Sequence, residues 1–163
     1  MCGKGGKTMN ISLWQAILIG VVYYLGITGT PWLTALGSTI IQKPLVAGVL
    51  VGCIMGDPVQ GAIIGAAIQL PFIAYISAGG APPTDPGLAG PLGTALAIAG
   101  GVKPTAAIAI AVPIGLLGTI IWVIHMTVDV FFVHAIDRAA AEGNMKKAKF
   151  LHIVPPQIFA FFL

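Results

Sequence analysis

Charged residues are scarce in this chain. Lys, Arg, Asp and Glu make up 8% of its 163 residues, whereas a soluble domain has about 25%. Hydrophobic residues make up 57%, and the mean hydropathy is +0.97. So few charged side chains cannot cover a surface that faces water. The composition therefore excludes an ordinary soluble domain and indicates an integral membrane protein.

Other absences narrow the function. The chain has only two cysteines, Cys2 and Cys53, which make no disulfide framework. It has no basic face with interleaved aromatic residues, so we expect no nucleic-acid partner. Gly6-Lys7-Thr8 looks like the end of a phosphate-binding loop, but Met1 stands where that loop needs its first glycine. A nucleotide site is therefore not expected.

The chain divides into a short leader and a long apolar part. Residues 1–10 are rich in Gly and Lys, and we expect them to be a disordered leader. We expect residues 11–163 to form a single membrane domain. Residues 11–28 are its first membrane helix, with Trp14 at one end and Tyr23 and Tyr24 towards the other, as interfacial aromatic residues are placed. The apolar residues 150–163 stop abruptly, which predicts a domain that is incomplete at its C-terminus.

The stretch 44–93 is almost wholly apolar, yet Gly and Pro interrupt it repeatedly. Glycines four residues apart, Gly48 with Gly52 and Gly61 with Gly65, predict two smooth helix faces that pack closely against each other. Residues 44–56 are too short to span a membrane, being about 20 Å long as a helix. They form either a short helix that stops at Asp57-Pro58 or a tilted helix that continues through this turn.

Three further segments complete the predicted fold. Residues 77–91 contain so many Gly and Pro that we expect no regular helix there. Residues 105–136 are the longest helical pattern, and residues 139–149 read as a polar turn whose basic residues place it in the cytoplasm. The predicted fold class is all-α: a polytopic membrane protein with Gly/Pro-broken helices, some of them re-entrant.

Polar residues inside the apolar stretch are the candidates for a site. Gln69 needs a partner in protein, water or substrate, and a helix-to-helix hydrogen bond is its structural alternative. Asp85 is either a turn-forming residue or a ligand-binding carboxylate. Asp57 is a weaker candidate, because a Gly-Asp-Pro turn also suits a helix cap.

A metal site or a catalytic centre is not expected. His125 and Asp129 are spaced i, i+4 on one helix face, but His134 does not continue that spacing. No third ligand joins them locally, and no positioned nucleophile accompanies a histidine. We expect no metal, no other cofactor and no catalytic residue.

Three blocks of residues together resemble a known family. The first runs from Lys43-Pro44-Leu45 through Val51-Gly52 to Gly56-Asp57, and the second from Gly65 through Gln69 to Asp85. The third contains His134-Ala135, Asp137-Arg138, Gly143-Asn144 and His152. In this order they resemble the IIC membrane subunit of the mannose/fructose/sorbose family of the bacterial sugar phosphotransferase system.

This resemblance implies a function and a set of partners. A IIC subunit pairs with a IID membrane subunit in the bacterial inner membrane and moves a sugar inward. Soluble IIA and IIB subunits relay phosphate, and IIB transfers it to the sugar, so the IIC subunit is not itself an enzyme. The expected substrate is a hexose or amino sugar, and we also expect a homo-oligomer. The residues expected to face the sugar are Gln69, Ser77, Gly79, Gly80 and Asp85, with Asp57 as the weaker candidate.

Two other function classes stay open at this point. A membrane scaffold or degenerate permease fragment would bind partners without transporting sugar. The early stop favours it, as do Gln69 and Ser77, which stand where the family commonly has Glu and Asn. A free-standing channel or secondary transporter would work without a phosphate donor.

Overall fold

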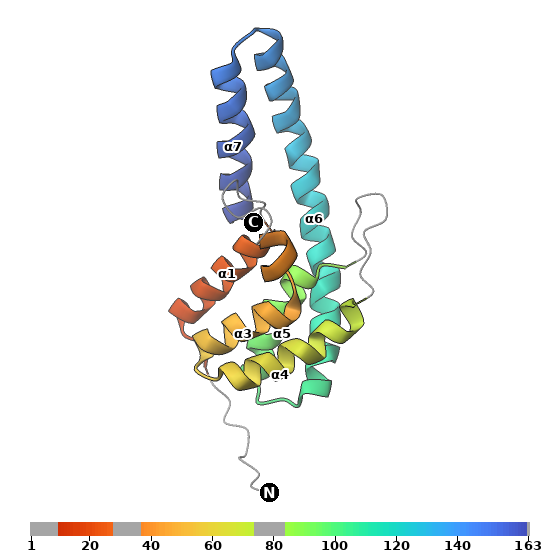
Figure 1. Ribbon diagram of the computed structural model, residues 1–163. Coiled ribbons are helices and arrows are strands. Elements are labelled where there is room, and N and C mark those ends of the chain that lie inside the picture. The colour runs from red at the N-terminus through yellow and green to blue at the C-terminus, as the bar shows by residue number, and fades with distance from the viewer. Residues whose placement is uncertain (1–9, 28–36, 74–83, 163) are drawn as a thin grey trace, which may run out of the picture. The chain divides into compact units, whose positions relative to one another are not determined.

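The computed structural model describes residues 10–27, 37–73 and 84–162 (Figure 1). Within these ranges every element is helical, as the sequence predicts. The chain forms two compact units, Met1–Thr119 and Ile120–Leu163, and helix α6 contributes to both. The elements are α1 (Leu13–Ile27), η1 (Gly37–Ile41), α3 (Pro44–Met55), α4 (Pro58–Gln69), η2 (Leu70–Phe72), α5 (Pro86–Ala99), α6 (Pro104–Ala141) and α7 (Met145–Phe162).

Helices α3 and α4 form a tight antiparallel hairpin in the first unit (Figure 1). Gly56 ends α3 in the left-handed conformation, with φ of 85°, which glycine adopts without steric cost. The Asp57 carboxylate then caps α4 by accepting a hydrogen bond from the Gln60 amide at 2.9 Å, and Pro58 occupies the first helical position. Of the two alternatives for residues 44–56, the short helix that stops at the turn is correct.

Glycine faces bring the backbones of this hairpin into direct contact. A Cβ atom on Gly48 would stand 2.7 Å from the Cα of Gly65, and one on Gly52 would stand 2.9 Å from the Cα of Gly61. Neither position has room for a side chain. The predicted packing of the two glycine faces against each other is confirmed.

Helix α5 corrects one prediction. Residues 86–91 were expected to be irregular, but they are the first turns of α5, and every residue from 85 to 91 is buried. Pro86 stands at a helix start, where its missing N–H costs nothing. Gly90 lies so close to α3 that a Cβ would be 2.8 Å from the Cα of Pro44. Here Gly and Pro permit close packing of a helix instead of breaking it.

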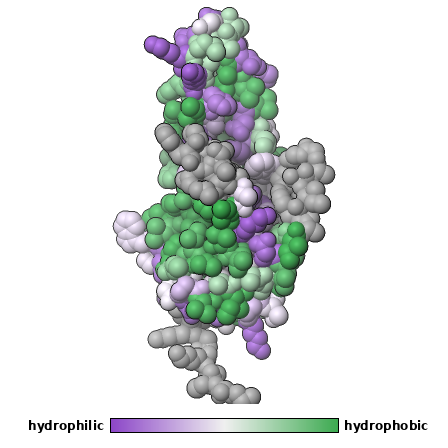
Figure 2. Space-filling view, viewed as in Figure 1, coloured by the Kyte–Doolittle hydropathy of each residue, from purple (hydrophilic) through white to green (hydrophobic). Residues whose placement is uncertain are grey.

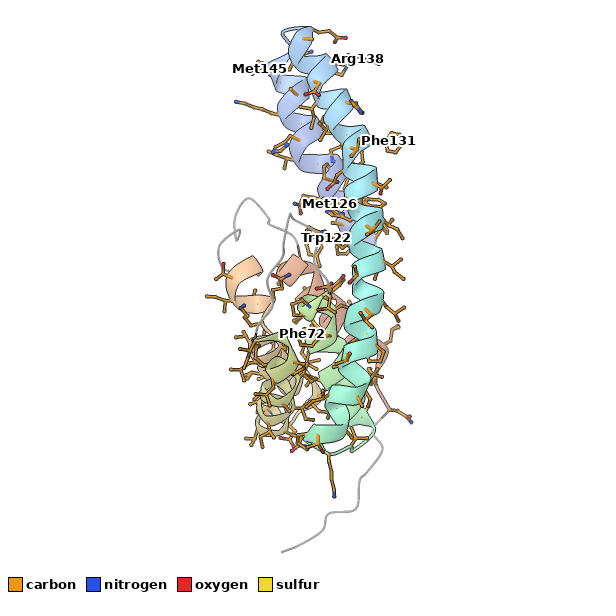
Figure 3. All side chains as sticks on the ribbon, turned by 90° about the vertical axis from the view of Figure 1, so that its right-hand side faces the viewer. Phe72, Trp122, Met126, Phe131, Arg138 and Met145 are labelled. Carbon is orange, nitrogen blue, oxygen red and sulfur yellow. The ribbon has the colours of Figure 1, made fainter. Side chains whose placement is uncertain are left out.

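Apolar side chains lie both inside the first unit and on its surface. Figure 2 shows hydrophobic side chains over much of the visible face of this unit. Figure 3 shows Phe72 among its helices, where the side chain is buried. The buried core includes Ile19, Val51, Met55, Ile64, Ile68, Phe72, Ala89 and Ile98. Large exposed apolar residues include Leu13, Trp14, Val59, Ile63, Leu70 and Ile73. Such a surface suits lipid and not water.

The second unit is a helical hairpin of the later part of α6 and α7. Asn144 begins α7 by accepting a hydrogen bond from the Lys147 amide at 3.1 Å, and Gly143 turns the chain with φ of 71°. Residues 139–149 were expected to be a polar turn, but α6 continues to Ala141 and α7 starts at Met145. The Gly-Asn pair provides both a turn and a cap, so the turn is shorter than the polar composition indicated. Figure 3 shows Arg138 and Met145 at this end of the hairpin.

Helix α6 differs from the others in length. With 38 residues and a peak hydropathy of 2.5, it is the one helix in the described ranges that is long and apolar enough to cross a membrane by itself. The sequence predicted this long helix over 105–136. The apolar helices α1, α3, α4 and α5 are shorter.

The hairpin contact gives a first prediction. We expect Gly61→Ala to destabilise the protein by about 1–3 kcal/mol, because the new methyl group would stand 2.6 Å from the Cα of Gly52 and force the backbones apart. Thermal unfolding in mild detergent measures this change. Gly20→Ala in α1 is the matched control, since a Cβ there meets nothing within 4 Å. Equal unfolding temperatures for Gly61→Ala and the control would contradict the packing described above.

Candidate functional site

Gln69 lies at the end of α4, beside the beginning of α3. Its Oε1 atom accepts a hydrogen bond from the Leu45 amide at 3.3 Å. Lys43, at the cap position of α3, provides no side-chain cap, so the Gln69 amide group takes over part of that role. Its oxygen therefore makes the helix-to-helix hydrogen bond that was one of the two alternatives for this residue.

Asp85 caps α5 and joins it to two other helices. Its Oδ1 atom accepts a hydrogen bond from the Gly87 amide at 2.8 Å, and its Oδ2 atom accepts one from the Tyr23 hydroxyl of α1 at 3.3 Å. Its own backbone N–H donates to the Gly115 carbonyl of α6 at 2.9 Å. Only 5% of the residue is exposed. Asp85 is thus a buried carboxylate at the meeting point of α1, α5 and α6.

Helix α6 makes space for this carboxylate with a glycine. A Cβ on Gly118 would stand 2.6 Å from the Cβ of Asp85 and 2.9 Å from its Oδ2 atom. Gly115 lies one turn earlier. A Cβ added there would stand 3.4 Å from the Asp85 carbonyl oxygen and 3.3 Å from the Phe72 ring. Any side chain larger than hydrogen at position 118 would displace the carboxylate.

The sequence interpretation missed Tyr23, Gly115 and Gly118. Tyr23 was assigned to an interfacial aromatic pair from its position near the end of the first apolar run. Its bond to Asp85 was missed because the two residues are 62 positions apart in the sequence. The glycines of α6 carried a detectable signal. Together with Ala107 and Ala111 they form a stripe of small residues three or four positions apart, and all four are buried.

The structure brings Gln69 and Asp85 to the same end of the first unit. Gln69 bonds to Leu45 at the start of α3. The Gln42 side chain, three residues earlier, reaches within 3.2 Å of the Cβ position of Gly87, next to Asp85. Both candidates therefore adjoin the N-terminal end of α3.

The other candidates are not placed there. Asp57 is exposed and caps α4 at the opposite end from Gln69, about 18 Å away along the helix. Asp57 and Gln69 therefore do not form one compact patch. Ser77, Gly79 and Gly80 lie outside the described residues.

His125 and Asp129 form a separate polar pair in the second unit. His125 Nε2 lies 3.3 Å from Asp129 Oδ2, which confirms that the two side chains share a helix face. The Phe159 ring of α7 stacks on the imidazole, with centroids 6.1 Å apart. Across the described residues, no three His, Cys, Asp or Glu side chains come together in a way that could hold a metal ion.

These observations first define a class of protein: a helical membrane protein whose apolar helices pack through glycine around buried polar groups. The comparisons then place it within a family. The chain belongs to the family of the sorbose-specific IIC component of the phosphotransferase system, which matches residues 13–163. The resemblance recognised in the sequence is confirmed.

Individual relatives agree with this assignment. The chain is 32% identical over 145 residues to the mannose-specific EIIC component of Escherichia coli K12, covering 89% of this chain and 53% of the relative. It is 34% identical over 144 residues to the sorbose-specific EIIC component of Lacticaseibacillus casei, covering 88% and 50%. The cryo-electron microscopy structure of the mannose transporter ManYZ with microcin E492 is similar, with a TM-score of 0.79 and 32% identity over 93% of this chain and 60% of that chain. The chain spans about half the length of the curated relatives it matches.

Proposed function

We propose that this chain is a sugar-translocating membrane subunit of a phosphoenolpyruvate-dependent phosphotransferase system. It takes up a hexose or amino sugar, which a IIB subunit phosphorylates after IIA has passed on the phosphate. It works with a IID-type membrane subunit and performs no phosphoryl transfer itself. The observation that carries this proposal is the buried carboxylate of Asp85, beside the same helix end as Gln69, in a chain of the IIC family.

The chemistry of these groups suits a polyol. A carboxylate accepts hydrogen bonds from hydroxyl groups, and such charge-assisted bonds are roughly twice as strong as neutral ones. The Gln69 amide group has both a donor and an acceptor, as a sugar hydroxyl does. We therefore assign sugar contact to Asp85 and Gln69, together with Ser77, Gly79 and Gly80. Asp57 is left out of this site because it lies at the other end of α4.

A scaffold without transport is the second candidate function. The polar atoms that would meet a sugar already have protein partners: Gln69 bonds to Leu45, and Asp85 bonds to Gly87 and Tyr23. A chain that kept these contacts permanently would be a folded membrane subunit with no binding site.

Co-purification with a IID-type subunit separates the two candidates. The full chain is expressed with that subunit, purified in mild detergent and titrated by calorimetry with mannose, fructose, sorbose and N-acetylgalactosamine. The transporter predicts a stable complex that binds at least one of these sugars. A stable complex that binds none of them indicates the scaffold.

Asp85→Asn tests the carboxylate charge. Asn still caps α5 through its one amide oxygen, and its NH2 group at the Oδ2 position donates to the Tyr23 hydroxyl, so the fold is preserved. We expect the sugar affinity of the complex to fall about fivefold to tenfold, because a charge-assisted bond becomes a neutral one. Asp137→Asn, which removes an exposed charge from α6, is the control and should bind as the wild type does. An unchanged affinity in Asp85→Asn would exclude sugar contact by the carboxylate.

Gln69→Leu tests the amide group. We expect a loss of about twofold to tenfold in sugar affinity, the value of one neutral hydrogen bond. The unfolding temperature should also fall, because α3 loses the partner of its Leu45 amide. The control is Gln60→Leu, which removes an amide from the other end of the same helix. Lower stability with unchanged affinity would show that Gln69 serves the fold alone.

A further inference from the structure

The Asp85 carboxylate is buried, and backbone lies against both of its oxygens. Oδ1 is held by the Gly87 N–H at 2.8 Å, and Gly118 leaves no space for even a methyl group beside Oδ2. Among the described residues, Tyr23 makes the one side-chain hydrogen bond to this carboxylate. The Tyr23 hydroxyl is therefore the side-chain donor at Oδ2 that a ligand hydroxyl could replace.

The carboxylate bonds of Asp85 to Gly87 and to Tyr23 differ in length and therefore in strength. The 2.8 Å bond from the Gly87 amide has the length of a charge-assisted N–H···O bond. The Tyr23 bond is 3.3 Å long, whereas a hydroxyl normally approaches a carboxylate to about 2.5–2.7 Å. The bond within α5 is therefore the strong one, and the bond between α1 and α5 is the one that can be exchanged.

Tyr23 and a sugar offer Asp85 the same chemistry. Each presents an O–H group that donates to a carboxylate oxygen, so replacing one with the other leaves no buried charge without a partner. We propose that the Tyr23 hydroxyl occupies the position of a sugar hydroxyl at Asp85, so that sugar binding displaces it. This inference rests on the proposed function and adds to it a residue that sets affinity.

The exchange also has a mechanical consequence for α1. Gln15, near the start of this helix, donates a hydrogen bond from Nε2 to the Ile54 carbonyl of α3 at 3.1 Å. Tyr23 makes another polar link, to Asp85 of α5, eight residues further along. When sugar takes the place of Tyr23, the later part of α1 loses its hydrogen bond to α5 while Gln15 still holds the earlier part.

Tyr23→Phe tests this competition, because it removes the hydroxyl and keeps the ring. In the complex of the full chain with a IID-type subunit, we expect the sugar to bind about threefold to tenfold more tightly, since it no longer competes with the tyrosine. The probe is whichever of mannose, fructose, sorbose and N-acetylgalactosamine binds the wild type most tightly. Gly20→Ala, also in α1 and in open space, should leave the affinity unchanged. A residue with a purely structural role would not increase affinity when truncated.

A second measurement follows the hydroxyl itself. The chain has three tyrosines, and labelling this chain alone with 3-fluorotyrosine, before it is combined with an unlabelled IID-type subunit, gives each a ¹⁹F resonance, assigned by substituting Tyr24 and Tyr75. We expect the Tyr23 resonance to move when the sugar saturates the complex.

Three results would overturn the proposal. Sugar binding by Tyr23→Phe that is equal to or weaker than that of the wild type excludes competition and leaves the proposed function intact. If that variant does not fold, a Tyr23 resonance unaffected by saturating sugar has the same meaning. A wild-type complex that binds none of the four sugars overturns the proposed function, and the exchange with it.

Discussion

Close contact between helix backbones is the constraint on which the first unit depends. Lipid is as apolar as a leucine side chain, so burying such side chains between membrane helices gives little driving force. Van der Waals contact has to supply the attraction, and it falls off steeply with distance. The glycines of α3 and α4 let the two backbones approach until no side chain fits between them. Gly90 and Gly93 do the same for α5 against its neighbours.

Short, closely packed helices expose another problem, which is that each helix end carries unpaired backbone groups. In this unit, polar side chains meet that need. Asp57 caps α4, Asp85 caps α5 and Gln69 bonds to the first turn of α3. The polar residues that stand out in an apolar sequence are therefore largely explained by the many helix ends that the Gly/Pro breaks create. A role in binding requires a property of these residues that capping does not need.

The sequence predicted the helical class, the glycine contact, the turn at Asp57 and the family. Each depends on local pattern: a four-residue glycine spacing, a Gly-Asp-Pro turn and a run of apolar residues. It did not predict that residues 86–91 are helical, because Gly and Pro in a buried helix have the same local appearance as Gly and Pro in a loop. The burial that stabilises α5 comes from α3, α4 and α6, which are distant in sequence.

The candidate site shows the same limit. Gln69 and Asp85 were identifiable as polar residues in apolar surroundings, and the stripe of small residues on α6 could have been noticed. Their partners could not be predicted, because Tyr23 meets Asp85 across 62 positions and Leu45 meets Gln69 across 24. A hydroxyl on an aromatic ring near a helix end also has an adequate explanation in interfacial anchoring. Only the folded chain shows which of the two roles Tyr23 has.

The charge of Asp85 is the feature that the fold alone does not explain. Asn or Ser would cap α5 about as well as Asp does, and the NH2 group of Asn would still form a hydrogen bond with the Tyr23 hydroxyl by donating to it. Asp57 has the same capping role at an exposed turn, where a charge costs little. Asp85 is 5% exposed, and burial of an ionised carboxylate in such surroundings is costly unless strong donors compensate it. Its donors are the Gly87 and Leu88 amides and the Tyr23 hydroxyl, and the bond from Tyr23 is long. In the proposed exchange, a sugar hydroxyl that approaches to the usual distance of about 2.5–2.7 Å would compensate this charge better than the 3.3 Å Tyr23 bond does, and a scaffold that binds no polyol would have no use for that difference.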